Sequence, residues 1–204
     1  MRYDNSRAEM APYVPLSARR VLDVGCATGG FGGELRARMP EAELWGLDPS
    51  PHPEERPQPY DRRLVGTFPE ALPDAERFDC IVFNDVLEHM MDPWAALVSA
   101  RGALEPDGCI VASLPNIRHV SVLKPLVLHG RFDYRDTGLL DRTHLRFFTR
   151  GTIADLFGAA AFRVTTLEPV RVSRDGRLAR IDRWLGGRLT DFLVEQYAVV
   201  ASPA

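Results

Sequence analysis

The sequence predicts an α/β fold with one mostly parallel sheet of seven strands, helices on both faces and an antiparallel strand at one edge. Apolar runs of strand length alternate with stretches of helical length along most of the chain. The 204 residues, 45% of them hydrophobic, are enough for one domain but too few for two. We therefore expect a single domain over residues 1–204, with no repeats and no disordered block.

The first half of the sheet is expected to begin with a strand, a helix and a second strand. The first strand is predicted over residues 19–25, the helix over 30–38 and the second strand over 42–48. Five prolines fall within residues 49–60, so the helix expected next is short or replaced by an irregular loop. A third strand follows at 62–66.

The second half continues the alternation. Asp92 is expected to cap a helix with Pro93 in its first position, and Thr149 is expected to cap another that runs to about Ala160. The remaining four strands are predicted over residues 78–84, 108–116, 161–168 and 192–202. The last two are close in sequence, which indicates the antiparallel edge.

Three segments fall outside this alternation. Residues 1–18 form an N-terminal arm, residues 117–148 follow the fifth strand, and residues 171–189 separate the last two strands. Ligands of open α/β sheets bind beyond the carboxyl ends of the strands. We therefore expect residues 117–148 to form a cap that determines substrate specificity.

Composition excludes several classes of protein. The net charge is −3, with 11 arginines against 19 acidic residues in 1–109 and 14 basic against 9 acidic residues in 110–204. The pI near 6.0 argues against a nucleic-acid partner. No apolar run approaches the roughly 18 residues needed to span a bilayer, and the first residues lack the apolar core of a leader peptide. A cytoplasmic protein without stable membrane insertion is expected.

The cysteines and histidines show no metal-binding spacing. The three cysteines are far apart and lie in or beside apolar runs, so we expect buried thiols. Neither a zinc-finger pattern nor a pair of histidines with metalloprotease spacing occurs, and no metal is predicted.

A glycine-rich turn after the first strand carries the strongest chemical signal. Gly25, Ala27 and Gly29 let a ligand approach the backbone, and Asp48 follows at a spacing suited to ribose hydroxyls. Gly25, Ala27 and Gly30 also fit a degraded dinucleotide-binding fingerprint, so a nicotinamide or flavin cofactor is an alternative. Asp23, however, would face a pyrophosphate with like charge, whereas it suits an ammonium or sulfonium ligand. The turn therefore favours a cationic cofactor.

At this point the sequence resembles the class I S-adenosylmethionine (SAM) methyltransferases. VLDVGCATG and LWGLDPS are similar to the first two motifs of that family. The resemblance continues through FDCIVFNDVLEHMMDP, LEPDGCIVASLPN and GLLDRTHLRFFT, and it covers nearly the whole chain. It implies a Rossmann-like fold, SAM as cofactor and S-adenosylhomocysteine (SAH) as product. The last motif resembles a bacterial branch of the family that is often linked to cell-surface glycans and small metabolites.

The resemblance also implies which residues bind the cofactor. Three residues of the turn would line the methionine part of SAM, with Asp23 on its ammonium side and Asp48 on the ribose hydroxyls. Asn84 would hold the methionyl amine, and Thr67 and Phe68 would flank adenine. Two positions depart from the family pattern: Ala27 replaces the usual middle glycine, and Thr67 stands where Asp is common. In the arm, Tyr3 and Arg7 could fold over the cofactor carboxylate, with an exposed arm as the alternative.

An alcohol acceptor would need a base to remove its proton. His144 is the first candidate, because Asp141 one turn earlier could orient its imidazole. His119, which enters the cap, and His89, which follows the fourth strand, are the next candidates. Asp85 and Glu88 are carboxylates near the same strand end, with structural capping as the favoured alternative. Two other histidines are expected to be structural or exposed: His52 in the Pro-rich loop and His129 at a helix end.

Residues 171–189 contain arginines at positions 171, 174, 177, 180 and 183. Steps of three drift about 60° on a helix, so these arginines would not form one basic stripe, which weakens a membrane-surface interpretation. A lid, a homodimer contact and a contact to a phosphate-bearing substrate remain as interpretations.

Together these observations predict a SAM-dependent methyltransferase that acts on an oxygen of a small molecule, such as a sugar or a secondary metabolite. The alternatives are a nitrogen or carbon acceptor, a non-catalytic SAM-binding regulator, and, disfavoured by Asp23, a nicotinamide-dependent oxidoreductase.

Overall fold

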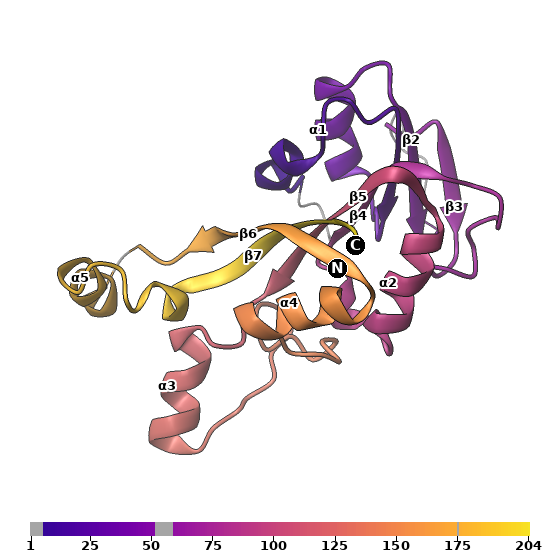
Figure 1. The fold of residues 1–204 in the computed structure, drawn as a ribbon. Coiled ribbons are helices and arrows are strands. Elements are labelled where there is room, and N and C mark those ends of the chain that lie inside the picture. The colour runs from indigo at the N-terminus through magenta and orange to yellow at the C-terminus, as the bar shows by residue number, and fades with distance from the viewer. Residues whose placement is uncertain (1–5, 52–58, 175) are drawn as a thin grey trace.

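The structure, a computed structural model, describes residues 6–51, 59–174 and 176–204 and arranges seven strands in one sheet (Figure 1). Along the sheet their order is β3-β2-β1-β4-β5-β7-β6. The strands are β1 (Arg20–Val24), β2 (Glu43–Asp48), β3 (Arg62–Val65), β4 (Phe78–Asn84), β5 (Leu104–Pro115), β6 (Phe162–Val172) and β7 (Val194–Pro203).

The first five strands pair in parallel, and β7 pairs antiparallel with both β5 and β6. The predicted fold class is confirmed. The one reversed strand is β7, which lies between β5 and the edge strand β6. Strands β5 and β6 are also longer than predicted, and β6 extends four residues beyond the predicted end at 168, to Val172.

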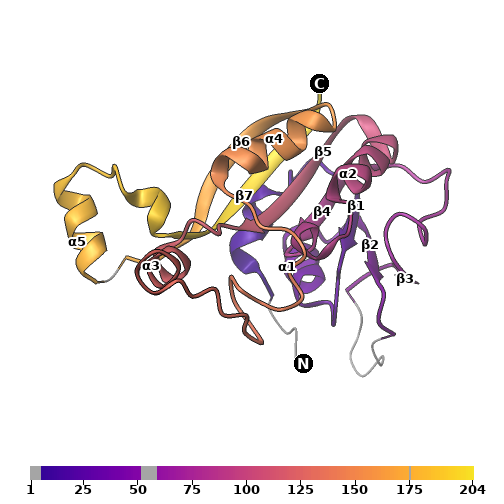
Figure 2. The same ribbon diagram turned by 90° about the horizontal axis from the view of Figure 1, so that it is seen from below.

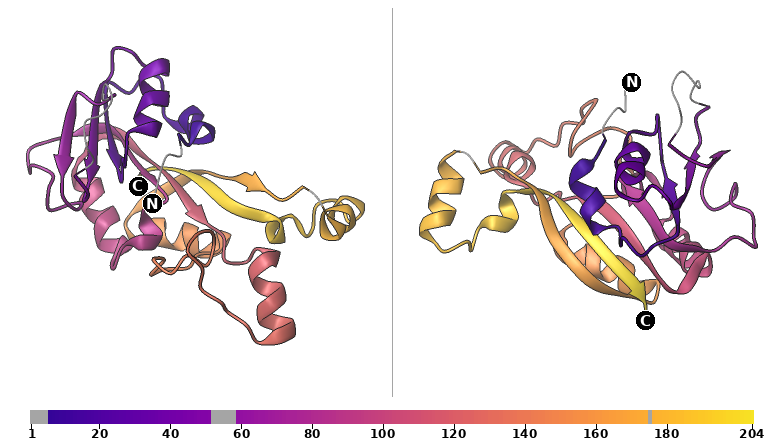
Figure 3. Two further views of the ribbon diagram at one scale, coloured as in Figure 1. Left: turned by 180° about the vertical axis from the view of Figure 1, so that it is seen from behind. Right: turned by 90° about the horizontal axis from the view of Figure 1, so that it is seen from above.

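Helices cover both faces of the sheet (Figures 1 and 3). On one face lie α2 (Pro93–Gly102) and α4 (Arg150–Ala159), and on the other lie α1 (Gly30–Arg38) and the short helix η1 (Ala8–Tyr13). The remaining helices are α3 (Val120–His129), α5 (Arg177–Trp184), η2 (Leu87–His89) and η3 (Thr190–Phe192).

Both predicted helix caps are present. Asp92 Oδ1 accepts a hydrogen bond from the backbone N–H of Ala95 over 2.9 Å, and Pro93 occupies the first turn of α2. Thr149 and Thr152 form a reciprocal capping box at the start of α4. These contacts satisfy backbone donors that the helix itself leaves without partners.

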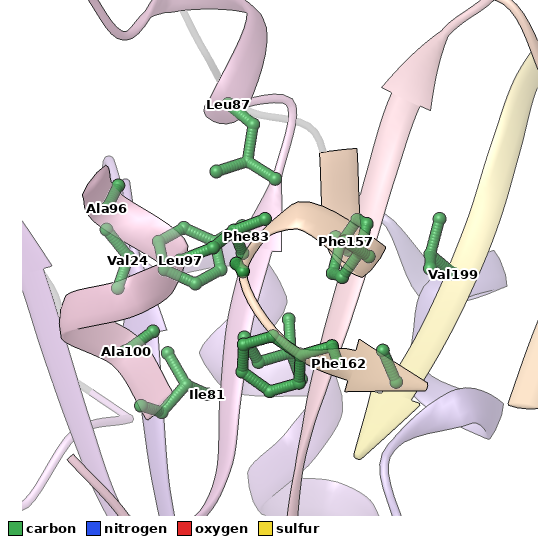
Figure 4. Close-up of a cluster of buried hydrophobic side chains, with 14 of the residues drawn as sticks. Val24, Ile81, Phe83, Leu87, Ala96, Leu97, Ala100, Phe157, Phe162 and Val199 are labelled. Carbon is green, nitrogen blue, oxygen red and sulfur yellow. The ribbon is translucent and has the colours of Figure 1, made fainter. Parts of the chain in front are cut away.

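Alternation along β4 divides the core between the two faces. Ile81 and Phe83 face α2 and α4, where Leu97 and Phe157 are also fully buried (Figure 4). Cys80 and Val82 of β4 point to the opposite face, where they pack with η1 and α1. All three cysteines are buried free thiols, as predicted.

The three segments outside the alternation lie in different parts of the fold. Residues 6–18 of the N-terminal arm include η1, which packs against the core through Met10 and Ala11. After β5, α3 ends at His129, as expected, with Gly130 in a left-handed conformation behind it. The β6–β7 ribbon carries α5 at its far end (Figure 2). Among the helices of the described residues, none is long and apolar enough to cross a membrane.

Candidate active site

The turn between β1 and α1 has the backbone conformation that its small residues predict. Gly25 and Gly29 have φ angles of 75° and 90°, and Ala27 has a φ of 44°. A Cβ atom at Gly25 would lie 2.5 Å from Cγ2 of Val86. Left-handed conformations are costly for residues with a Cβ, which explains why glycine is usual at the middle position that Ala27 occupies.

Asp48 lies at the end of β2 against this turn. Its Oδ2 accepts a hydrogen bond from the backbone N–H of Ala27 over 2.9 Å, and its Oδ1 accepts one from Ser50 over 2.9 Å. The side chain is 8% exposed. The structure thus brings together the residue expected to bind ribose and the turn expected to line the methionine part.

Asp23 lies at the base of the same turn and is bound by Tyr60. The Tyr60 hydroxyl donates a hydrogen bond to Asp23 Oδ2 over 2.5 Å. Burial, together with the nearby Asp48 carboxylate, raises the pKa of Asp23 to about 7, although the Tyr60 hydrogen bond and the Arg63 guanidinium oppose this increase. Asp23 can therefore gain or lose its charge near neutral pH.

The sequence interpretation missed Tyr60 and Arg63. Space for the Tyr60 ring comes from two glycines, because a Cβ at Gly32 would lie 2.5 Å from Tyr60 Cζ and one at Gly46 would lie 2.8 Å from Cδ2. Glycines inside a helix and a strand are the sequence signal that a bulky group lies close to the backbone. Arg63 projects from β3 and donates to the carbonyl oxygen of Ala27.

Asn84 ends β4 and carries the clearest sign of a ligand-binding role. Both its amide nitrogen and its amide oxygen are buried without a hydrogen-bond partner in the described part of the chain. Buried polar atoms are normally satisfied, so a donor and an acceptor left open at a strand end fit a polar ligand. An amino acid moiety such as the methionyl part of SAM supplies both kinds of partner.

Arg7 of the arm reaches the same strand end. Its Nη1 lies 2.9 Å from Asp85 Oδ2, and its Nη2 donates to Ser113 Oγ over 2.8 Å. Arg7 is 5% exposed, and Asp85 has a φ of 55°. Arg7 is thus a buried partner of Asp85 and not part of an exposed arm. Tyr3 and His52 lie outside the described residues.

The two residues expected near adenine have different surroundings. Thr67 follows β3 in an exposed position and donates to Glu70 Oε2 over 3.0 Å. Phe68 is 7% exposed, and its ring packs edge-on against Phe83 at 5.4 Å between centroids. The ring of Phe68 therefore contributes to the core.

His89 and His144 lie together beyond the carboxyl end of β4. Their ring centroids are 4.8 Å apart. Nδ1 of His144 lies 3.2 Å from the carbonyl oxygen of Leu139, and Nδ1 of His89 lies 3.1 Å from that of Thr143. A carbonyl can only accept, so each Nδ1 carries a proton and each Nε2 is left with a lone pair in the neutral ring.

Asp141 does not orient His144 in the way the sequence suggested. Its Oδ1 accepts hydrogen bonds from the backbone N–H and the hydroxyl of Thr143, over 2.8 and 2.6 Å. Asp side chains commonly bind the backbone two residues later, and this local contact wins over the imidazole. The Leu139 carbonyl takes the orienting position instead.

His119 caps α3 and lies in a different hydrogen-bond network. Its Nδ1 accepts from the backbone N–H of Ser121, and its Nε2 lies 3.2 Å from Ser173 Oγ. Burial lowers its pKa, and the side chain is nearly inaccessible. Both ring nitrogens are engaged, so the structure does not bring His119 together with His89 and His144.

Glu88 lies beneath the histidine pair and anchors the cap. Its carbonyl oxygen accepts from Leu145 and Arg146 over 2.8 and 3.0 Å. Its side chain is 1% exposed, and burial and Asp85 raise its pKa well above the usual value. Ligand atoms of Glu88, His89 and His144 lie within 4.8 Å of one another. The two imidazoles therefore lie beside a buried carboxyl group.

The strand order, the glycine turn and the polar groups at the carboxyl ends of β1, β2 and β4 define a class I SAM-dependent methyltransferase. Residues 2–167 match the family described as "Methyltransferase domain". The chain belongs to this family. The predicted class, fold and SAM cofactor are thereby confirmed.

Several known proteins are similar to the chain. A ubiquinone biosynthesis O-methyltransferase from Azorhizobium caulinodans is 32% identical over 163 residues, which cover 75% of this chain and 62% of that protein. One of the same description from Cereibacter sphaeroides is 36% identical over 117 residues, covering 53% of this chain and 46% of that protein. The chain thus matches about half the length of such curated relatives.

Solved structures share the fold. A SAM-dependent methyltransferase from Archaeoglobus fulgidus has a TM-score of 0.65 and 20% identity, covering 95% of this chain and 91% of that one. The plantazolicin methyltransferase BpumL, in complex with a monoazolic desmethylPZN analog and SAH, has a TM-score of 0.66 and 15% identity, covering 99% of this chain and 84% of that one. At these identities the likeness concerns the fold alone.

Proposed function

We propose that this chain transfers the methyl group of SAM to an oxygen atom of a small molecule. The observation that carries this proposal is the pair of partly exposed imidazoles, His89 and His144, whose Nε2 atoms are free to accept a proton beyond the end of β4. The curated relatives named O-methyltransferases support oxygen as the acceptor atom.

The cofactor-binding residues would be those gathered around the glycine turn. Asp23 would face the methionyl ammonium, Asp48 would bind the ribose hydroxyls, and the open amide of Asn84 would bind the methionyl group. Gly25, Ala27 and Gly29 would let the ligand approach the backbone, and Thr67 would lie at the adenine end. When bound, SAM supplies an electrophilic methyl group on a sulfonium that leaves as a neutral thioether.

His144 would act as the general base. Its pKa is lowered, chiefly by burial and then by His89, so the ring is neutral at pH 7 and its Nε2 can accept a proton. Nε2 would take the proton of the acceptor hydroxyl as the new carbon–oxygen bond forms. The Leu139 carbonyl at Nδ1 would stabilise the imidazolium that results. His89 would supply the second imidazole of the pair.

Residues 117–148 would cap the acceptor. The segment carries His144, and it is joined to η2 through the carbonyl of Glu88 and through the His89–Thr143 contact. A hydroxylated small molecule such as a sugar or a secondary metabolite would bind beneath it. A nitrogen or carbon acceptor, or a non-catalytic SAM-binding role, is the alternative that the test below addresses.

Transfer of labelled methyl from SAM into a panel of hydroxylated, amine and carbon acceptors tests this function. For an accepted alcohol, His144→Ala should lower kcat by about 100-fold or more and leave SAH affinity unchanged. His129→Ala, at the exposed end of α3, is the matched control and should retain full activity. Full activity of His144→Ala would remove the base role, and labelling of amines alone would overturn the oxygen assignment.

A further inference from the structure

The end of the β6–β7 ribbon exposes apolar side chains that the methyl-transfer site does not use. On α5, Trp184 is 85% exposed and Ile181 is 48% exposed. On α3, Val127 is 76% exposed and Leu128 is 63% exposed. Exposed apolar side chains on protruding helices are typical of surfaces that bind another protein or a membrane.

Helices α3 and α5 lie at the same end of the molecule in every view (Figures 1, 2 and 3). The base of α3 is tied to the ribbon by His119, which lies 3.2 Å from Ser173 Oγ, and by Arg118, which lies 2.7 Å from Asp191 Oδ2. We call the exposed apolar residues of α3 and α5, with the arginines of α5, the distal surface.

Helix α5 separates its apolar and basic side chains. At 100° per residue, Trp184, Ile181, Leu185 and Leu178 fall within an arc of about 120°. Arg177 lies within that arc, and Arg180 and Arg183 follow beside it, whereas Ala179 and Asp182 are buried against the protein. Arg180 and Arg183 therefore lie along one flank of the apolar arc, and Arg177 lies within it.

The arginines of α5, Arg177, Arg180 and Arg183, have no acidic partner among the residues that the structure describes. The acidic Asp182 turns inward to accept from Leu189 and Thr190. An apolar arc flanked by free cations is the pattern of a helix that lies in the interface of an anionic bilayer.

From these observations we propose that the distal surface binds peripherally to an anionic lipid bilayer, with Trp184 and Ile181 entering the headgroup region and the arginines contacting lipid phosphates. A second copy of the chain fits less well, because apposed distal surfaces would bring like charges together. A nucleic acid fits less well, because its phosphates offer nothing to cover Val127, Leu128 and Ile181.

Sedimentation with vesicles tests the proposal on the full chain. Vesicles of phosphatidylglycerol and phosphatidylcholine should bind the protein, and vesicles of phosphatidylcholine alone should bind it weakly. Raising the salt concentration from 50 to 500 mM should release it. On binding to anionic vesicles, the emission of Trp184 should shift to shorter wavelength. Absence of binding to anionic vesicles would overturn the proposal.

Variants assign the binding to its residues. Trp184→Ser should weaken binding to anionic vesicles roughly tenfold, and Arg180→Gln with Arg183→Gln should weaken it about 30-fold. Trp94→Ser, on α2 and 42% exposed, is the control and should bind like the wild type. SAH binding, unchanged in every variant, reports an intact fold.

Two further results would contradict the proposal. One is a lipid-free dimer that Trp184→Ser dissociates, which would assign the surface to a second copy. The other is DNA or RNA binding that the arginine variants abolish and Trp184→Ser spares.

Discussion

The hydroxyl of Tyr60 donates a hydrogen bond to Asp23 Oδ2 over 2.5 Å inside the protein. Tyr60 is the last residue of the Pro-rich segment, and Asp23 precedes the glycine turn. The hydrogen bond favours the ionised form of Asp23, whereas burial and Asp48 favour the neutral form. The charge of the proposed ammonium site is therefore set by a balance that single substitutions can shift.

The raised pKa of Asp23, about 7 in the folded protein against 3.8 as the usual value, predicts pH-dependent stability and binding. Its contribution to stability is fully present below pH 3.8 and is lost as the pH rises through about 7. Binding of SAH, whose ammonium prefers the ionised acid, should tighten over the same rise to neutrality. Calorimetric titrations from pH 6 to 8 measure this dependence.

Two variants isolate the role of Asp23. Tyr60→Phe removes the hydrogen bond that lowers the pKa, so the rise in SAH affinity should move to higher pH. Asp23→Asn cannot ionise and should give weak, pH-independent binding. An unchanged pH profile in Asp23→Asn would assign the titration to another group.

Gly32 should tolerate alanine only when the Tyr60 ring is absent. A Cβ at Gly32 would lie 2.5 Å from Tyr60 Cζ, so Gly32→Ala should destabilise the protein by about 1–3 kcal/mol through overpacking. In a Tyr60→Ala background the same substitution should cost little, because the clashing atoms are gone. Chemical denaturation of the wild type, the two single variants and the double variant completes this double-mutant cycle. An equal loss of unfolding free energy from Gly32→Ala in both backgrounds would refute the packing argument.

Ala27→Gly should stabilise the protein. Ala27 has a φ of 44°, a conformation that costs an L-residue about 1–2 kcal/mol, and glycine loses roughly 0.5–1 kcal/mol of that gain through its more flexible unfolded state. A net increase of about 0.5–1 kcal/mol is expected. Thermal unfolding measures it, with Gly102→Ala, at the end of α2 with open space around it, as a control for glycine exchange itself. A lower melting temperature for Ala27→Gly would contradict the strain assigned to this turn.

The pH profile of methyl transfer should report the histidine pair. His144 has a pKa below its ordinary 6.5, because of burial and then of His89, so the acid limb of kcat should lie below pH 6.5. His89→Gln removes one cause of this lowering and should move the limb to higher pH. A limb that stays in place would mean that His144 is not the titrating base.

Local patterns of the chain predicted its elements well. The Asp92–Pro93 and Thr149 caps and the glycine turn are each specified by a few neighbouring residues, and the structure contains all of them. The sheet order follows because alternating strands and helices leave few topologies. The end of β6 was missed because its last residues pair with β7, a long-range partner that periodicity does not reveal.

The candidate site could be predicted only in part. Its backbone conformation depends on residues that are adjacent in sequence, whereas its side chains bind residues that are distant in sequence. Tyr60 reaches Asp23 across 37 positions of the sequence, and Arg7 reaches Ser113 across 106. Where a local contact was available, it displaced the expected one: Asp141 binds Thr143 and leaves the imidazole of His144 to the Leu139 carbonyl.

Titration calorimetry with SAH, and with NADH as the parallel ligand, tests the central claim most directly. The open amide of Asn84, the Asp48 carboxylate and the ionisable Asp23 together predict micromolar binding of SAH and no response to NADH. Asp48→Ala should clearly weaken the SAH signal. Absence of SAH binding by the folded wild-type protein would contradict the assignment of this turn as the cofactor site.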